Sequence, residues 1–162
     1  MPNKRLVQAP LSTAAVEQFR EGAVAQYAAI CFRQTWEPEI TEILLITSRD
    51  TGRWVIPKGW GMRKMLPHEV AEREAWEEAG VVGHADAKPC GCYTCLKALK
   101  KGNVEPVHVQ VHMLSVARLD RKFPEEGQRI LRWFSPEQAS AAVAETELKS
   151  LLDQVPRLLR GS

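Results

Sequence analysis

The chain alternates apolar stretches with polar turns, and six of these stretches predict β-strands. They lie at residues 23–32, 41–49, 54–56, 90–99, 107–119 and 129–134. The first is almost continuously apolar, which predicts a mostly buried strand, and residues 34–40 form a polar turn after it. Strand after strand at this spacing predicts a sheet as the main element of the fold.

The stretch 107–119 alternates with the period of two that a strand imposes on its side chains. Its apolar face carries Val107, Val109, Val111 and Met113. Its other face carries His108, Gln110 and His112. The polar face is interpreted as a solvated or substrate-facing surface rather than a metal site.

Two stretches carry the end signals of helices. Residues 67–79 begin with proline, which suits the first helical turn, and Gly80 after them suits a left-handed helix end. Ser135 to Gln138 have the order of an N-cap, a proline and a capping-box glutamine, so a second helix is predicted to begin there. Mixed strands with two helices predict an α+β sandwich, and the lack of repeats or linkers predicts one domain over residues 1–162.

Composition narrows the function classes. The 162 residues are 44% hydrophobic and 26% charged, which is ordinary for a soluble globular domain. A formal net charge of +2 is too small to imply a nucleic-acid partner, and four cysteines do not suggest a disulfide scaffold. The N-terminal segment lacks the apolar core of a signal peptide, and no apolar run reaches the length of a membrane span. We therefore expect a cytoplasmic protein without a membrane partner, as a monomer or a homodimer.

The helix predicted at 67–79 crowds acidic residues on one side. Glu74 and Glu78 lie one turn apart, Glu77 lies beside them, and Arg73 borders them four residues before Glu77. Like charges at this spacing repel by roughly a few tenths of a kcal/mol per pair. Either solvent and Arg73 disperse this repulsion or a cation binds there, and the segment REAWEE alone favours the solvated surface.

The loop before the helix reverses that preference. From Gly59 to Gly80 the chain reads GWGMRKMLPHEVAEREAWEEAG, which resembles the Nudix box, a glycine loop followed at fixed offsets by glutamates and an arginine. The matching positions are Gly59, Arg73, Glu74, Ala75, Glu77, Glu78, Gly80 and Val81. Met65 stands where the family has its first glutamate. The flanking segments RWVIPKG and RWFSPEQA are also similar to Nudix sequences, so the resemblance covers most of the chain.

The resemblance implies a Nudix fold, an α/β/α sandwich with a mixed β-sheet, and a hydrolase that cleaves a diphosphate linkage by attack of water on phosphorus. The expected substrate is a phosphorylated small molecule, and the expected cofactor is Mg²⁺, with Mn²⁺ as a substitute. The implied metal ligands are the Gly59 carbonyl and the carboxylates of Glu74, Glu77 and Glu78. Arg73 is implied to orient one of these glutamates from behind.

The general base is open. The family often uses a glutamate outside the box, or one within it. In the segment FPEEGQR, Glu125 and Glu126 are the candidates outside the box. A plain solvated turn explains either residue equally well.

Basic residues near the glycine loop and at a predicted hairpin suggest how phosphates are bound. The candidates are Arg49, Arg53, Lys58, Lys97, Lys100 and Lys101. If they converge, they suit a substrate with several phosphates, whereas the lysines alone also fit a solubilising hairpin tip. The segments SRDTGRWVIPKG and EEAGV are most similar to the family branch with diphosphoinositol polyphosphate and dinucleoside polyphosphate hydrolases. Nucleotide sugars, oxidised nucleoside triphosphates and capped RNA ends stay open.

Other interpretations remain beside the enzyme. A catalytically weak, nucleotide-binding sensor with the Nudix fold is favoured by Met65, and a protein-interaction domain is the third class. Cys90, Cys92 and Cys95 have the spacing of zinc ligands, but no fourth ligand is evident nearby, so reduced thiols are preferred. Trp60, in the glycine loop, is the one tryptophan placed to meet a ligand.

Overall fold

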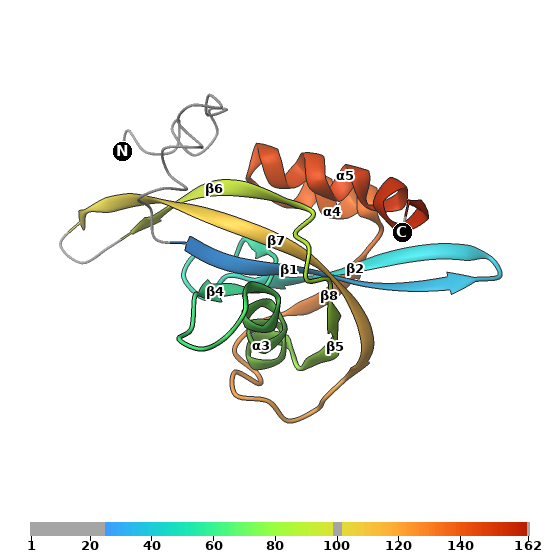
Figure 1. Cartoon of the computed structure of the whole chain (residues 1–162), viewed down its shortest axis with the longest axis horizontal. Coiled ribbons are helices and arrows are strands. Elements are labelled where there is room, and N and C mark those ends of the chain that lie inside the picture. The colour runs from blue at the N-terminus through green and yellow to red at the C-terminus, as the bar shows by residue number, and fades with distance from the viewer. Residues whose placement is uncertain (1–24, 99–101, 162) are drawn as a thin grey trace.

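The computed structural model describes residues 25–98 and 102–161, and within them one mixed sheet of eight strands is covered by helices (Figure 1). The strands are β1 (Ala25–Trp36), β2 (Glu39–Thr47), β3 (Trp54–Val55), β4 (Lys58–Trp60), β5 (Val81–Ala85), β6 (Gly91–Ala98), β7 (Val104–Leu119) and β8 (Leu131–Phe134). The helices are α3 (Pro67–Ala79), α4 (Pro136–Ala142) and α5 (Thr146–Arg160).

Strand β1 lies at the centre of the sheet. It pairs antiparallel with β2 and parallel with β7, in the order β3-β2-β1-β7-β5. The start of β1 also pairs with β4, so that Gln26 lies opposite Trp60 and Tyr27 opposite Gly59. This register places the beginning of β1 beside the glycine loop that leads into α3.

The two faces of the sheet form two separate cores. Because side chains alternate along a strand, Ala28 and Ile30 of β1 face α4 and α5, whereas Ala29 and Cys31 face α3. On the α3 side the helix contributes small residues, Ala71, Ala75 and Ala79, which let it approach the sheet closely. Figure 1 shows α3 on one side of the sheet and α4 with α5 on the other. The prediction of an α/β/α sandwich with a mixed sheet is confirmed.

Helix α3 begins and ends where its sequence predicts. Pro67 occupies the first turn, and the Leu66 N–H donates a hydrogen bond of 2.8 Å to the Glu69 carboxylate. Gly80 ends the helix with φ of 70°, a conformation that glycine adopts without strain. In the described ranges, none of the helices combines the length and apolarity needed to span a bilayer.

Several sequence-based expectations were wrong in detail. The turn predicted at 34–40 shrinks to two residues, because β1 and β2 continue as a polar ribbon joined by pairs such as Arg33–Glu42, 2.9 Å apart. Strands β4 and β5 were not predicted, because three and five residues are too short to show a period. The C-terminal region holds two helices, since Val143 is extended and interrupts the pattern. The strand predicted from residue 23 is described only from Ala25 onward, and that predicted to end at Leu99 only to Ala98.

The polar face of β7 is buried, which contradicts the interpretation of His108, Gln110 and His112 as a solvated or substrate-facing surface. His112 is fully buried and His108 nearly so. The His112 ring bonds the Asp86 carbonyl through Nδ1 at 2.7 Å and the Gln110 amide through Nε2 at 2.9 Å. Burial lowers the pKa of His112, which keeps its ring neutral. The side chains of β7 alternate as predicted, but helices cover both faces of the sheet, so its polar face is buried as well.

Candidate active site

The glycine loop and α3 meet at Gly59 and Glu74. Gly59 lies on β4, and the Glu74 carboxylate rests directly on its backbone, so that a Cβ at position 59 would overlap this carboxylate. Only glycine leaves room for the glutamate. The two residues therefore lie in contact, and both are among the metal ligands that the Nudix resemblance implies.

Glu78 lies one turn further along α3 and is almost buried, with 8% of its surface exposed. The Lys58 backbone N–H donates a hydrogen bond of 3.3 Å to its Oε1 atom. The Arg129 guanidinium lies 3.5 Å from its Oε2 atom. Strand β4 and the loop before β8 thus hold this carboxylate from two directions.

Arg129 connects the parts of the site and was not among the sequence candidates. Its guanidinium contacts Glu125 at 3.0 Å and donates to the Thr47 carbonyl at 3.1 Å, and its side chain is 9% exposed. The sequence offered only one weak signal, an arginine two residues before the apolar strand β8, and this arginine was assigned to the strand itself. A cation enclosed by two carboxylates is a strong electrostatic anchor, because removing one partner leaves the other charge buried and unpaired.

The carboxylates of Glu74 and Glu78 both have raised pKa values, near 7. For Glu78 burial is the main cause, the charges of Glu74 and Glu125 raise the pKa further, and Arg129 and the Lys58 N–H oppose the shift. For Glu74 the causes are burial, then the charges of Glu77 and Glu125, opposed by Arg129 and Arg73. At neutral pH the pair therefore favours a proton or a bound cation over two free negative charges.

Arg73 and Glu77 pair with each other on the more exposed side of α3. The Arg73 Nε atom donates to the Glu77 carboxylate at 2.8 Å, and the guanidinium lies 5.5 Å from the Trp76 ring. The Glu77 charge still raises the pKa of Glu74, and the Glu77 carbonyl accepts a hydrogen bond of 3.0 Å from the Glu125 N–H. Glu77 therefore interacts both with Glu74 on α3 and with the loop that carries Glu125.

The two candidate bases, Glu125 and Glu126, have different surroundings in the structure. Glu125 is half-buried, contacts Arg129 and lies 3.5 Å from Arg49, and its charge influences both Glu74 and Glu78. Glu126 is exposed and does not line the cleft. The structure therefore brings Glu125, and not Glu126, to the acidic cluster.

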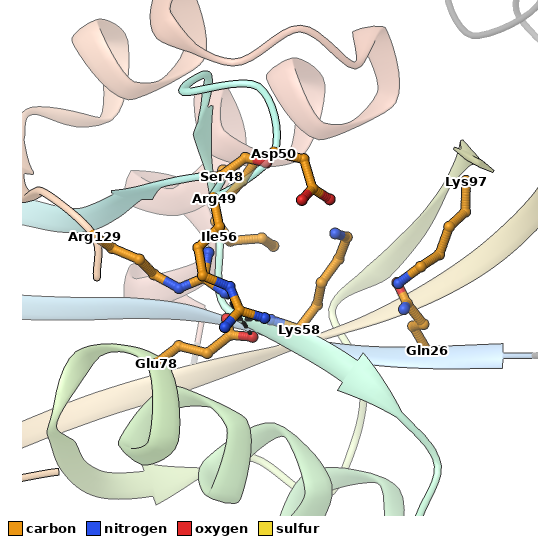
Figure 2. Close-up of a pocket in the computed structure, with 10 residues that line it drawn as sticks. Gln26, Ser48, Arg49, Asp50, Ile56, Lys58, Glu78, Lys97 and Arg129 are labelled. Atoms are coloured by element: carbon orange, nitrogen blue, oxygen red, sulfur yellow. Dashed lines mark hydrogen bonds and ion pairs between the residues drawn. The ribbon is translucent and has the colours of Figure 1, made fainter. Parts of the chain in front are cut away.

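A cleft with two compartments opens beside Glu78 (Figure 2). The smaller compartment, about 160 Å³, is lined by Glu78 and Arg129 and by the predicted cations Arg49, Lys58 and Lys97. The larger, about 310 Å³, is lined by Arg53, Lys58 and Lys97, and by residues of β6 and Glu145. The cations that the sequence suggested for phosphate binding converge on one cleft, except Lys100 and Lys101, which lie outside the described residues.

Met65, which replaces the first glutamate of the box, lies away from this cleft. It is half-buried in a separate groove with Arg73 and Trp76, on the outer side of α3. Neither compartment of the cleft includes it. The departure from the family pattern therefore changes the surroundings of Arg73 and leaves Glu74 and Glu78 in place.

The donor atoms fit magnesium better than a metal held by protein alone. Among the described residues, no three histidine, cysteine or acidic side chains come close enough together to hold an ion by themselves. Magnesium commonly takes one or two carboxylates and completes its octahedron with waters and substrate phosphates. Glu74 and Glu78, with raised pKa values beside a cation-lined cleft, match that requirement.

The cysteines and the tryptophan that the sequence singled out lie on or beside strands of the sheet. Cys90, Cys92 and Cys95 are reduced thiols on and beside β6, and burial raises the pKa values of Cys90 and Cys95. Trp60 packs against the sheet core, and the Lys97 ammonium lies 4.9 Å from its ring. The tryptophan thus holds a cleft lysine in position.

Comparisons with known proteins agree with this geometry. The family model described as NUDIX domain matches residues 26–155. Human diphosphoinositol polyphosphate phosphohydrolase 3-alpha is 31% identical over 122 residues, which cover 74% of this chain and 68% of that protein. Rat diphosphoinositol polyphosphate phosphohydrolase 2 is 39% identical over 64 residues, which span only about a third of its length (35%) and 40% of this chain.

Among solved structures, one of an Ap4A hydrolase binary complex from C. elegans is similar over 86% of this chain and 99% of its own, with a TM-score of 0.62. A Nudix family hydrolase from Clostridium perfringens is similar over 83% of this chain and 99% of its own, with a TM-score of 0.55. Their sequence identities of 22% and 16% support the fold alone.

Proposed function

The chain belongs to the Nudix family of pyrophosphohydrolases, and on that premise we propose that it hydrolyses a diphosphate linkage in a polyphosphorylated small molecule with a divalent cation held by Glu74 and Glu78. The observation that carries this proposal is the pair itself. Glu74 and Glu78 have pKa values near 7, and Glu78 lines a cleft that is also lined by arginines and lysines. Such a pair is costly in an empty site and suited to a cation.

The described residues divide the work of hydrolysis. When bound, magnesium neutralises phosphate charge and makes water more acidic. Gly59 leaves the space that the Glu74 carboxylate occupies against β4, and the Lys58 N–H donates a hydrogen bond to Glu78. Arg129 contacts Glu125 at 3.0 Å, and this contact supports the proposal that the Glu125 carboxylate accepts the proton of the attacking water.

The cations of the cleft support a substrate with more than one phosphate. Arg49 and Lys58 lie near Glu78, and Arg53 and Lys97 extend the positive lining into the larger compartment. The relatives named for diphosphoinositol polyphosphates and the structural neighbour named for Ap4A act on molecules of this kind. Each exposed contact to a phosphate is worth about 1 kcal/mol and weakens with salt.

In the sequence, Met65 favoured a ligand-binding sensor that does not hydrolyse its ligand. Its position in a groove outside the cleft removes that support, because the carboxylates that would hold the cation are retained. The cation is proposed to be Mg²⁺, with Mn²⁺ as a substitute, and the protein is proposed to act in the cytoplasm as a monomer or homodimer.

A panel of diphosphate compounds tests this function. Wild type should release phosphate-containing products in magnesium and lose this activity in EDTA. Glu78→Gln should lower kcat by at least about a hundredfold, the size of an essential electrostatic contact. The control is Glu137→Gln, which changes an exposed glutamate on α4 far from the cleft and should match wild type. Turnover that is equal in all three proteins would contradict the assignment.

A further inference from the structure

Gln26 has a buried side-chain oxygen with no hydrogen-bond partner among the residues that the structure describes. The residue is 2% exposed, and its Oε1 atom accepts no hydrogen bond from residues 25–98 or 102–161. Buried polar atoms are almost always paired in native proteins, because an unpaired one has lost its hydrogen bonds to water without replacement. An orphaned acceptor in a cleft wall therefore points to a donor that arrives with a ligand.

The location of Gln26 identifies which part of a ligand it would meet. Strand pairing places it between Trp60 of β4 and Val109 of β7. It lines both compartments of the cleft, together with Lys58 and Lys97. Figure 2 shows Glu78 and Arg129 at one end of the cavity and Gln26 and Lys97 at the other, with Lys58 between them. Gln26 thus lies at the end of the cavity away from Glu78 and Arg129, in the wall that the two compartments share.

The chemistry around Gln26 favours an uncharged donor over another phosphate. An amide oxygen only accepts hydrogen bonds, and a phosphate group that is fully ionised has none to donate. Asp50 lines both compartments and Glu145 lines the larger one, so acidic side chains share this end of the cleft with Lys58 and Lys97. The organic group nearest a phosphate chain in a nucleotide is its sugar, which carries hydroxyl donors.

We propose that Gln26 is a specificity-determining residue whose Oε1 atom accepts a hydrogen bond from a sugar hydroxyl beside the phosphate chain of the substrate. The site then prefers a polyphosphate that ends in a free sugar over a ring whose hydroxyls are all phosphorylated. This inference rests on the proposed function, because it concerns the substrate of the same cleft.

The test compares two ligands that differ only in hydroxyls: diadenosine tetraphosphate and its counterpart without the 2′ and 3′ hydroxyls. Gln26→Met keeps the length of the side chain, removes the orphaned oxygen and is expected to melt no lower than wild type. The matched control is Gln34→Met on the same strand, where the amide donates to Thr41 at 3.3 Å outside the cleft.

In wild type and in Gln34→Met, kcat/KM should be about tenfold to a hundredfold higher for the ligand with hydroxyls, the size expected for one buried hydrogen bond. In Gln26→Met the ratio should fall to about one, through loss on the hydroxyl ligand only. An unchanged ratio, or an equal loss on both ligands, would overturn the role of Gln26. So would a higher wild-type kcat/KM on diphosphoinositol pentakisphosphate than on diadenosine tetraphosphate.

A binding measurement in EDTA separates this inference from the proposed function. The rise in melting temperature with each ligand reports binding without turnover. If wild type hydrolyses neither ligand, the proposed hydrolysis fails. A larger rise with the hydroxyl ligand that disappears in Gln26→Met would still support the Gln26 contact. Equal rises with the two ligands, or no rise with either, would overturn it.

Discussion

The charge on Glu78 should destabilise the protein in the absence of metal, and the size of this effect follows from its surroundings. Burial and the charges of Glu74 and Glu125 raise its pKa from 4.5 to about 7 in the folded chain. Between these two values the folded state binds the proton more tightly than the unfolded chain does. The stability that the Glu78 carboxyl contributes is therefore fully present below pH 4.5 and is lost as the pH rises through 7.

A shift of this size corresponds to about 3 kcal/mol of unfolding free energy for so buried a group. Glu78→Gln cannot titrate, so this loss should be missing from the variant. The free energy of unfolding of the variant relative to wild type should rise by about 3 kcal/mol between pH 4.5 and pH 8. Loss of the ion pair with Arg129 changes the offset between the two curves more than their pH dependence.

The assay is urea unfolding in EDTA across this pH range, followed by tryptophan fluorescence. Glu137→Gln, on the exposed side of α4, should follow wild type at every pH. Magnesium added at pH 8 should stabilise wild type by about 2–3 kcal/mol at a hundred times its dissociation constant, and should stabilise Glu78→Gln far less. Parallel pH curves for wild type and Glu78→Gln would refute the reasoning.

Three other substitutions test neighbouring parts of the site. Met65→Glu should change the rate or the magnesium affinity by about tenfold or less, since the residue lies beside Arg73 outside the cleft. Activity found only in this variant would contradict the proposal that the wild-type protein is an active hydrolase. Arg129→Met should cost about 3–5 kcal/mol of unfolding free energy at pH 8, because it leaves two carboxylates unpaired, and an unchanged urea midpoint would exclude the anchoring role. Glu125→Gln should lower kcat by about 10²–10⁴ while Glu126→Gln leaves it near wild type, and the reverse order would assign the base to Glu126.

The predictability of the fold depended on the length of each element. Helix α3 was predicted with both ends because proline and glycine mark them, and β7 because it alternates over many residues. Strands β4 and β5 were missed because their pairing with β1 and β7, not their own composition, makes them strands. The burial of His112 could not be predicted, since the partner that accepts its hydrogen bond is a backbone carbonyl 26 residues away.

In the candidate site too, the sequence identified some residues and missed others. Spacing within one helix identified Glu74 and Glu78, because residues four apart must share a helix face. It could not identify Arg129 or Gln26, whose surroundings come from strands, loops and helix α3 that meet only in the fold. Neither residue belongs to a sequence motif. Arg129 is distinguished by its burial between carboxylates, and Gln26 by a buried oxygen that has no partner among the described residues.

Hydrolysis of diadenosine tetraphosphate in ¹⁸O-labelled water tests the central claim most directly. In magnesium, wild type should place the label in one phosphate-containing product, which mass spectrometry identifies, because water attacks phosphorus. The labelled product should be lost in EDTA, and its rate of formation should fall at least about a hundredfold in Glu78→Gln. Labelled product that forms at the wild-type rate in EDTA and in Glu78→Gln would contradict a cation held by the α3 carboxylates.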